Sequence, residues 1–249
     1  MGDMAGLRTI ITGGAAGIGR ATAEWFAAGG ALVASLDKSV PRDLSPGIIA
    51  LSCDVSDDTS VRAAVAEAAE QLGGIDVVVN NAGIGAAGDV SANSDDEWLR
   101  LYDVNVVGMA RVSRAALPHL RRSQHPCIIN MSSIVAIAGL PERAAYSATK
   151  GAVQALTMAM AADHAGEGIR VNCVNPSTVD TPWVRRLIET ASDPAAMRAS
   201  LENRQPTGRL IAPEEVAAAV GYLASPAASG LTGVSLPVDG GMFGLRPRR

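Results

Sequence analysis

The sequence predicts an α/β fold in which helices cover both faces of one doubly wound, parallel sheet. Short apolar segments alternate with longer helical ones along the 249 residues, which favours βαβ units. Hydrophobic residues make up 48% of the chain and aromatic residues only 3%, as expected when small apolar side chains fill strands covered on both faces. No Pro/Ser-rich linker or internal repeat divides the chain, so we expect a single domain over residues 1–249.

Each expected strand is a short apolar run, and each expected helix is longer and rich in small residues. In chain order, the expected strands are 8–12, 31–36, 48–52, 75–80, 127–131, 169–174 and 234–238. The expected helices are 18–28, 57–72, one around 104–119 and one that carries Tyr146.

The segment over about 182–205 does not fit this alternation. It is polar and rich in arginine, and it lies between the last two expected strands. Insertions at the carboxyl ends of strands in doubly wound sheets usually build the ligand site. We therefore expect a short helical substrate lid here.

Composition and charge exclude several classes of function. The net charge of −4 argues against a nucleic-acid partner. No apolar run reaches the roughly 18 residues of a membrane span, and the start, MGDMAGLRT, lacks a secretory hydrophobic segment. The three cysteines are scattered without CxxC spacing and the three histidines form no ligand pattern, so we expect no metal site. The expected location is the cytoplasm.

A glycine-rich turn, "TIITGGAAGIGRA", follows the first expected strand and opens the first helix. Gly13 can form the tight turn, Gly17 lets the backbone approach a pyrophosphate, and Gly19 lets helix and strand pack closely. The N–H groups of the helix start add a partial positive charge. The spacing is TGxxxGxG rather than GxGxxG, so the turn alone also fits an ordinary loop.

Asp37 ends the second expected strand, where the acidic residue of a dinucleotide-binding fold accepts hydrogen bonds from the adenosine ribose. A carboxylate there repels a 2′-phosphate, and Ala16 supplies no balancing cation. The neighbouring Lys38 complicates this assignment because it carries a positive charge. The alternative is that Asp37 is only a turn residue at the end of the strand. We expect NAD rather than NADP.

Four polar residues indicate proton chemistry. Tyr146 and Lys150 in "RAAYSATKGA" are four residues apart, which places them on one face of a helix. Ser133 follows the strand 127–131, and Asn105 is polar within an otherwise apolar helix. Taken singly, Tyr146 and Lys150 could be a surface pair, Ser133 a loop hydroxyl and Asn105 a buried amide.

Together these motifs resemble the short-chain dehydrogenase/reductase family over nearly the whole chain. The matching stretches are "TGGAAGIG", "CDV" at 53–55, "NNAG" at 80–83, Asn105, Ser133, "YSATK" at 146–150 and "VNCVNPSTVDTP" at 171–182. The resemblance implies a Rossmann-like fold and oxidation or reduction at a secondary alcohol. One departure is Ser177, where the family usually has glycine.

The resemblance also assigns roles to single residues. It implies that Tyr146 is the general acid/base, that Ser133 orients the substrate oxygen and that Asn105 holds a water in the proton relay. Lys150 would bind the nicotinamide ribose and lower the pKa of Tyr146. The implied cofactor contacts are Gly13, Ala16, Gly17, Ile18, Gly19, Asp37, Asp54, Val55, Asn81, Tyr146, Lys150, Val179 and Thr181.

The pairing of Tyr146 with Lys150 has a physical purpose. A free tyrosine titrates near pH ~10 and is a poor base at neutral pH. A nearby ammonium and the positive nicotinamide favour the phenolate by ~1–3 pK units. Tyr146 would then take a hydroxyl proton while hydride leaves the alcohol carbon.

Arginines suggest an acidic substrate. Arg143 precedes Tyr146 by three residues and Arg204 ends the expected lid, while Arg185 and Arg186 begin it. Arginine suits bidentate capture of a carboxylate. These residues resemble a subgroup that includes 3-hydroxybutyrate and 2-keto-3-deoxy sugar acid dehydrogenases, which implies a small hydroxy acid. Alternatively, these arginines are solvated lid residues or subunit contacts. For the protein as a whole, the alternative functions are a 3-oxoacyl thioester reductase and a non-catalytic dinucleotide-binding regulator.

The segment "GAVQALTMAMAADHA", residues 151–165, is apolar or small on nearly every side. A helix of that kind is buried. We expect this helix and the one around Asn105 to form a symmetric subunit interface, and the family resemblance implies a homotetramer.

Overall fold

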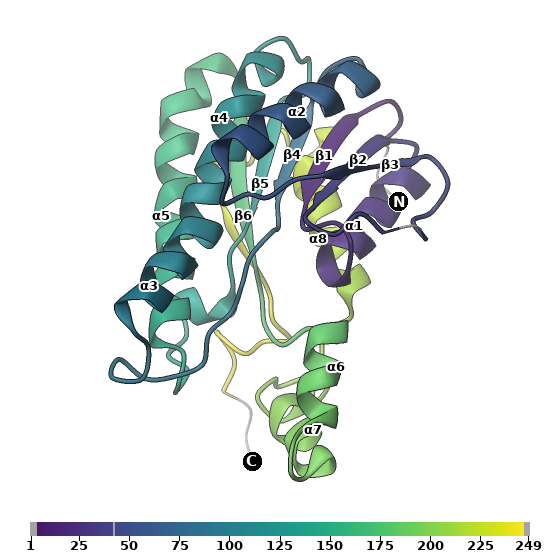
Figure 1. The fold of residues 1–249 in the computed structure, drawn as a ribbon. Coiled ribbons are helices and arrows are strands. Elements are labelled where there is room, and N and C mark those ends of the chain that lie inside the picture. Colours follow the sequence, from purple (N-terminus) through teal and green to yellow (C-terminus); the bar gives the residue numbers. More distant parts are fainter. Residues whose placement is uncertain (1–3, 42, 247–249) are drawn as a thin grey trace.

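The computed structural model describes residues 4–41 and 43–246, so the ends of the predicted domain and Arg42 lie outside the described residues. All seven strands of its one sheet are parallel, in the order β3-β2-β1-β4-β5-β6-β7 (Figure 1). The chain starts at β1 near the middle, moves outward to β3, and returns to continue from β4 in the other direction. The predicted doubly wound sheet is confirmed, and its switch point lies between β1 and β4.

The strands begin and end close to their predicted positions. Three of them, β1, β3 and β5, have the predicted bounds, and the others differ by at most two residues at either end. The bounds are β1 Arg8–Thr12, β2 Leu32–Asp37, β3 Ile48–Ser52, β4 Val77–Asn80, β5 Cys127–Met131, β6 Arg170–Pro176 and β7 Ser235–Val238.

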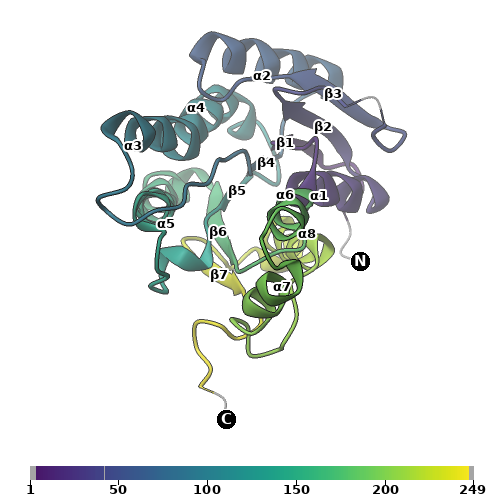
Figure 2. The same cartoon turned by 60° about the horizontal axis from the view of Figure 1, so that its bottom comes forward.

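Helices cover both faces of the sheet (Figures 1 and 2). Successive strand side chains point to opposite faces, so Ile10 belongs to the core with α2 and α4, while Ile11 belongs to the core with α1 and α8. The helix bounds are α1 Gly17–Ala28, α2 Asp58–Leu72, α3 Asp95–Tyr102, α4 Gly108–Leu120, α5 Ala144–His164, α6 Pro182–Glu189, α7 Pro194–Glu202 and α8 Pro213–Ala224. No helix among the described residues is long and apolar enough to cross a membrane.

The helix predicted around 104–119 is interrupted near its start. A π-helical turn over Asp103–Val107 joins the unpredicted α3 to α4, and the Gly108 N–H donates to the Asp103 carbonyl five residues earlier. Single π turns often mark functional sites. Here the turn carries Asn105, whose side chain is completely buried.

The predicted lid consists of α6 and α7, which project from the carboxyl edge of the sheet on the side opposite α3 (Figures 1 and 2). Their apolar side chains form a cluster separate from the two cores of the sheet. This lid cluster contains Val184, Ile188, Leu201 and Leu210, with Met197 packed against it.

Candidate active site

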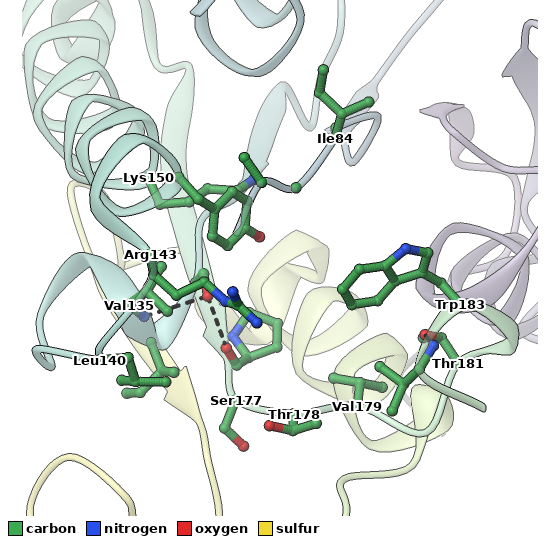
Figure 3. A pocket seen from close by; sticks show the side chains of 18 of the residues that line it. Ile84, Val135, Leu140, Arg143, Lys150, Ser177, Thr178, Val179, Thr181 and Trp183 are labelled. Atoms are coloured by element: carbon green, nitrogen blue, oxygen red, sulfur yellow. Dashed lines mark hydrogen bonds between the residues drawn. The ribbon is translucent and has the colours of Figure 1, made fainter. Parts of the chain in front are cut away.

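A cavity of about 740 Å³ lies at the carboxyl edge of the sheet, between the lid and the ends of β4 to β6 (Figure 3). This is the place where open α/β sheets bind ligands. Predicted site residues from distant parts of the chain meet there: Ile18, Asn81, Ser133, Arg143, Tyr146, Lys150, Val179, Thr181 and Arg204.

Tyr146 and Lys150 lie on the first two turns of α5 and are not a surface pair. Lys150 is only 3% exposed, and its Nζ lies 5.6 Å from the centroid of the Tyr146 ring. Nζ donates a hydrogen bond of 2.9 Å to the carbonyl of Met131 at the end of β5. Burial lowers the pKa of Lys150 to about 8. The ammonium is therefore held beside the phenol at a defined position.

Burial in the cavity wall raises the pKa of the Tyr146 hydroxyl above its ordinary value. A hydrogen bond with Ser133 and the positive charge of Arg143 act in the opposite direction and lower that pKa. Arg143 therefore has a second possible role beyond substrate binding. The predicted lowering of this pKa by Lys150, whose ammonium lies beside the ring, stays a prediction.

Ser133 lies two residues beyond β5 and is 8% exposed. Its Oγ donates to the Pro176 carbonyl at 3.5 Å and accepts from the Val135 N–H at 3.4 Å (Figure 3). Both hydrogen bonds are long and therefore weak. The hydroxyl can turn toward a substrate oxygen at little energetic cost.

Asn105 connects three parts of the site from behind the cavity wall. Its Oδ1 accepts from the Ile84 N–H at 2.8 Å, and its Nδ2 donates to the Ile84 carbonyl at 2.9 Å and to Thr149 Oγ1 at 3.1 Å. Thr149 in turn donates to the Tyr146 carbonyl at 2.8 Å. The amide group of Asn105 thus links the Ile84 loop to α5 through Thr149, and the predicted role of Asn105 in holding a water stays a prediction. Thr149 was not predicted, although "YSATK" contains it.

The glycine-rich turn has the geometry that its sequence predicts. Gly13 and Gly17 have φ of 66° and 55°, and a Cβ on Gly19 would lie 2.1 Å from the Gly13 carbonyl oxygen. No side chain caps the start of α1 at Ala16, whereas side chains cap α2, α3, α6 and α7. Uncapped N–H groups beside a close backbone approach fit the pyrophosphate of a dinucleotide.

The side chain of Asn81 is hydrogen-bonded to the backbone of this turn. Its Nδ2 donates to the carbonyls of Thr12 and Gly13 at 3.0 and 3.1 Å. Val55, another predicted cofactor residue, packs against Gly108, where an added Cβ would lie 3.0 Å from its side chain. Asn81 thus holds the glycine-rich turn and Val55 packs against the start of α4, while their predicted contacts with the cofactor stay predictions.

Two carboxylates lie at the carboxyl ends of β2 and β3. Asp37 accepts from the backbone N–H groups of Ala15 and Ser39 at 3.1 and 3.0 Å, so it closes the glycine-rich turn. Asp54 forms an ion pair of 2.7 Å with Lys38. Hydrogen bonds from Lys38 and Ser56 lower the pKa of Asp54 to about 2. Lys38 is thus paired with an acid of this chain.

Thr181 joins the glycine-rich turn to the lid. Its Oγ1 accepts from the Val184 N–H at 3.3 Å and so caps α6, while its methyl group lies 3.3 Å from where a Cβ of Gly17 would be. Val179 is buried and pairs with Ile211 in an isolated bridge. The predicted nicotinamide contacts are therefore part of the hinge between β6 and the lid.

Arg143 and Arg204 line the same cavity, and neither has a carboxylate partner among the described residues. Arg143 donates to the Glu142 carbonyl at 2.7 Å, and Glu142 has an unusual positive φ of 56°. Figure 3 shows Arg143 on the wall opposite Trp183, an unpredicted aromatic lining residue. Arg185, by contrast, pairs with Asp180 at 2.9 Å. The cavity lining thus includes two guanidinium groups, Arg143 and Arg204, that form no ion pair among the described residues, together with Arg100, Lys150 and the carboxylate of Glu97.

A family model described as enoyl-(acyl carrier protein) reductase matches residues 13–243, which include the glycine-rich turn, the Tyr146–Lys150 pair and the lid. The chain belongs to the short-chain dehydrogenase/reductase family. Members of this family are oxidoreductases that use a nicotinamide dinucleotide, and the present chain is one of them, acting on CH–OH groups.

The relatives of this short-chain dehydrogenase act on several kinds of alcohol. It is 42% identical to meso-2,3-butanediol dehydrogenase of Serratia marcescens, with 93% of this chain and 92% of that protein covered. It is 39% identical to L-fucose dehydrogenase of Bos taurus, covering 95% and 89%. It is also 39% identical to cis-4-hydroxycyclohexanecarboxylate dehydrogenase of Sinomonas cyclohexanicum, covering 93% and 94%. These relatives do not single out the 3-hydroxybutyrate subgroup that the sequence resembles.

Solved structures agree with the fold. Aldohexose dehydrogenase of Thermoplasma acidophilum superimposes with a TM-score of 0.93 at 37% identity, covering 100% of this chain and 98% of that one. A 3-ketoacyl-(acyl-carrier-protein) reductase of Brucella melitensis, complexed with NADH, superimposes with a TM-score of 0.88 at 35% identity, covering 96% and 99%.

Proposed function

We propose that this enzyme interconverts a small hydroxy acid and the corresponding keto acid, with NAD as the cofactor. The observation that carries the proposal is the pair Arg143 and Arg204, which line the cavity beside Tyr146 without a carboxylate partner among the described residues. Arg143 is half-buried and Arg204 is exposed. A substrate carboxylate would give these guanidinium groups a charge-assisted, bidentate partner.

In this proposal the chain's own residues perform the proton transfer. A bound nicotinamide would supply the hydride acceptor for the alcohol carbon, and we expect the cavity-lining residues Lys150, Val179 and Thr181 to hold it. Tyr146 takes the hydroxyl proton, and Ser133 donates a hydrogen bond that keeps the substrate oxygen in place. For reduction, Tyr146 gives the proton back.

The preference for NAD is supported by the charges around the adenosine half. Asp37 at the end of β2 would repel a 2′-phosphate on the adenosine ribose, and the nearby Lys38 is paired with Asp54. This ion pair is weak because the Lys38 side chain is 67% exposed, so the proposed preference for NAD rests mainly on Asp37. We also propose that residues 1–249 act as one domain, with 182–205 as its lid.

The relatives support two classes of substrate. The similarity to cis-4-hydroxycyclohexanecarboxylate dehydrogenase favours a hydroxy acid, whereas butanediol, fucose and aldohexose dehydrogenases favour neutral polyols. A panel of hydroxy acids, sugar acids, neutral diols, sugars and a 3-oxoacyl thioester, run with NAD(H) and NADP(H), separates these classes. We expect the highest kcat/KM for a hydroxy acid with NAD.

Arg204→Ala should lower kcat/KM for that hydroxy acid about tenfold or more, because a charge-assisted pair of roughly 1.5–3 kcal/mol is partly replaced by water. It should change kcat/KM little for a neutral alcohol of similar size. Arg204 is a cleaner probe than Arg143, since Arg143 also lowers the pKa of Tyr146 and its loss should affect every substrate.

Arg185→Ala is the matched control, because Arg185 is also a lid arginine but is bonded to Asp180. It should leave unchanged the ratio of kcat/KM for the hydroxy acid to kcat/KM for the neutral alcohol. Equal losses on both substrates with Arg204→Ala, or no loss on either, would contradict the hydroxy acid assignment.

We further propose that the protein is a homotetramer whose interfaces include α5 and the start of α4. In the single chain Met158 of α5 is 58% exposed and Val107 is 41% exposed. A subunit interface over these elements would cover both side chains. Light scattering at micromolar concentration should give four times the mass of the 25.5 kDa chain, and Met158→Glu should lower it. A wild-type monomer under these conditions contradicts the proposal.

A further inference from the structure

One buried glutamine attaches the end of the lid to the loop that follows β6. Gln205 is 2% exposed, and its Oε1 accepts a hydrogen bond from the Ser177 hydroxyl. Its Nε2 donates to the Thr178 carbonyl at 3.4 Å. A buried amide left without partners is costly, so these hydrogen bonds determine where the lid ends.

The Ser177 end of this link is held by the sheet. The Ser177 N–H donates to the carbonyl of Val238 in β7 at 3.2 Å. Beyond Gln205, the Thr207 N–H donates to the Gly240 carbonyl at 3.3 Å. The lid therefore returns to a part of the chain that is fixed by the last strand.

Arg204 directly precedes Gln205 and lines the cavity. It lies beyond the end of α7 at Glu202 and outside the apolar lid cluster. Its side chain has no hydrogen bond or ion pair to another described residue. Its backbone is held on one side by α7, through the Asn203 and Gln205 N–H groups that donate to the carbonyls of Ala199 and Glu202. On the other side it is held by the link from the Gln205 side chain to the Ser177 hydroxyl.

Ser177 is also the residue at which this chain departs from the family pattern, which has glycine there. A glycine has no hydroxyl and cannot form the link to Gln205. We propose that Ser177 and Gln205 are positioning residues that hold Arg204 against the substrate carboxylate and so set the preference for hydroxy acids over neutral alcohols. This inference rests on the proposed function.

The test compares Ser177→Ala with Ser177→Thr, which keeps a hydroxyl, using 3-hydroxybutyrate, 2-butanol and NAD. Ser177→Ala should raise the KM for 3-hydroxybutyrate about three- to tenfold, as expected for one lost hydrogen bond, with kcat and the KM for 2-butanol nearly unchanged. Ser177→Thr should stay close to the wild type. Gln205→Met, which keeps the size of the side chain, should reproduce the effect of Ser177→Ala.

Two further measurements separate positioning from a general defect. In the Arg204→Ala background, Ser177→Ala should cause no additional rise in KM, because both changes remove the same interaction. Hydrogen exchange of the amides at 203–208 should become faster in Ser177→Ala without any substrate present.

The outcomes distinguish the two hypotheses. Full additivity of Ser177→Ala with Arg204→Ala, or unchanged exchange at 203–208, overturns the positioning role alone. An equal rise in KM for 3-hydroxybutyrate and 2-butanol in Ser177→Ala overturns it as well. Arg204→Ala on its own reports on the hydroxy acid assignment, whatever Ser177→Ala does.

Discussion

Replacing Tyr146 by phenylalanine should lower kcat for alcohol oxidation by a factor of about 10²–10⁴, the usual contribution of a general acid/base. The ring that lies 5.6 Å from Lys150 Nζ is kept, so the packing of α5 should not change. Only the group that accepts the proton is lost. The dissociation constant of NAD, measured by fluorescence titration, should therefore be close to that of the wild type.

The pH dependence of the wild-type enzyme provides an independent check on the same residue. Oxidation needs the phenolate, so kcat/KM should rise with pH through the pKa of Tyr146. Because Ser133 lowers that pKa, Ser133→Ala should move the rise to higher pH. Near-normal turnover in Tyr146→Phe, or a pH profile that Ser133→Ala leaves in place, would refute this role for Tyr146.

Asp37→Ala should reduce kcat/KM with NAD about ten- to a hundredfold, because charge-assisted hydrogen bonds to the ribose hydroxyls are lost, each worth roughly 1.5–3 kcal/mol. The value of kcat/KM with NADP should fall less, so the kcat/KM values for the two cofactors should become more similar. Steady-state kinetics with both cofactors measures the ratio directly.

Asp37 also accepts from Ala15 and Ser39, so alanine removes structural hydrogen bonds as well as the charge. Asp37→Asn keeps an acceptor and serves as the matched variant. If the carboxylate repels the 2′-phosphate, Asn should narrow the NAD/NADP ratio while preserving much of the turn. A ratio that neither variant changes would make Asp37 a turn residue only.

The strands were predictable because their signal is local. Runs such as Cys127–Met131 are apolar, short and bounded by polar residues, and their burial on both faces makes the pattern continuous. In contrast, α3 is only eight residues long, so the helical spacing of Trp98, Leu101 and Tyr102 covers too short a window to identify a helix. Its signal was the cap, Ser94 followed by Glu97 three residues later.

The site was predictable where a residue type is tied to a motif and unpredictable where it depends on tertiary contacts. The sequence places Tyr146 and Lys150 on one helix face, but it cannot show that Lys150 bonds to the Met131 carbonyl. The pairing of Lys38 with Asp54 likewise joins two strand ends through space. The π turn at Asp103–Val107 adds no composition signal, so a continuous helix was the natural expectation.

The separation of the lid cluster from the two sheet cores has a consequence for how such enzymes diversify. Val184, Ile188, Leu201 and Leu210 pack mainly with one another, so substitutions around them disturb the cores that stabilise the sheet very little. The lid, which we propose selects the substrate, can therefore accumulate changes while the rest of the protein keeps folding. A laboratory library confined to residues 182–205 should retain a high fraction of soluble variants, and new substrate ranges should arise there sooner than in a library of equal size spread over the strands.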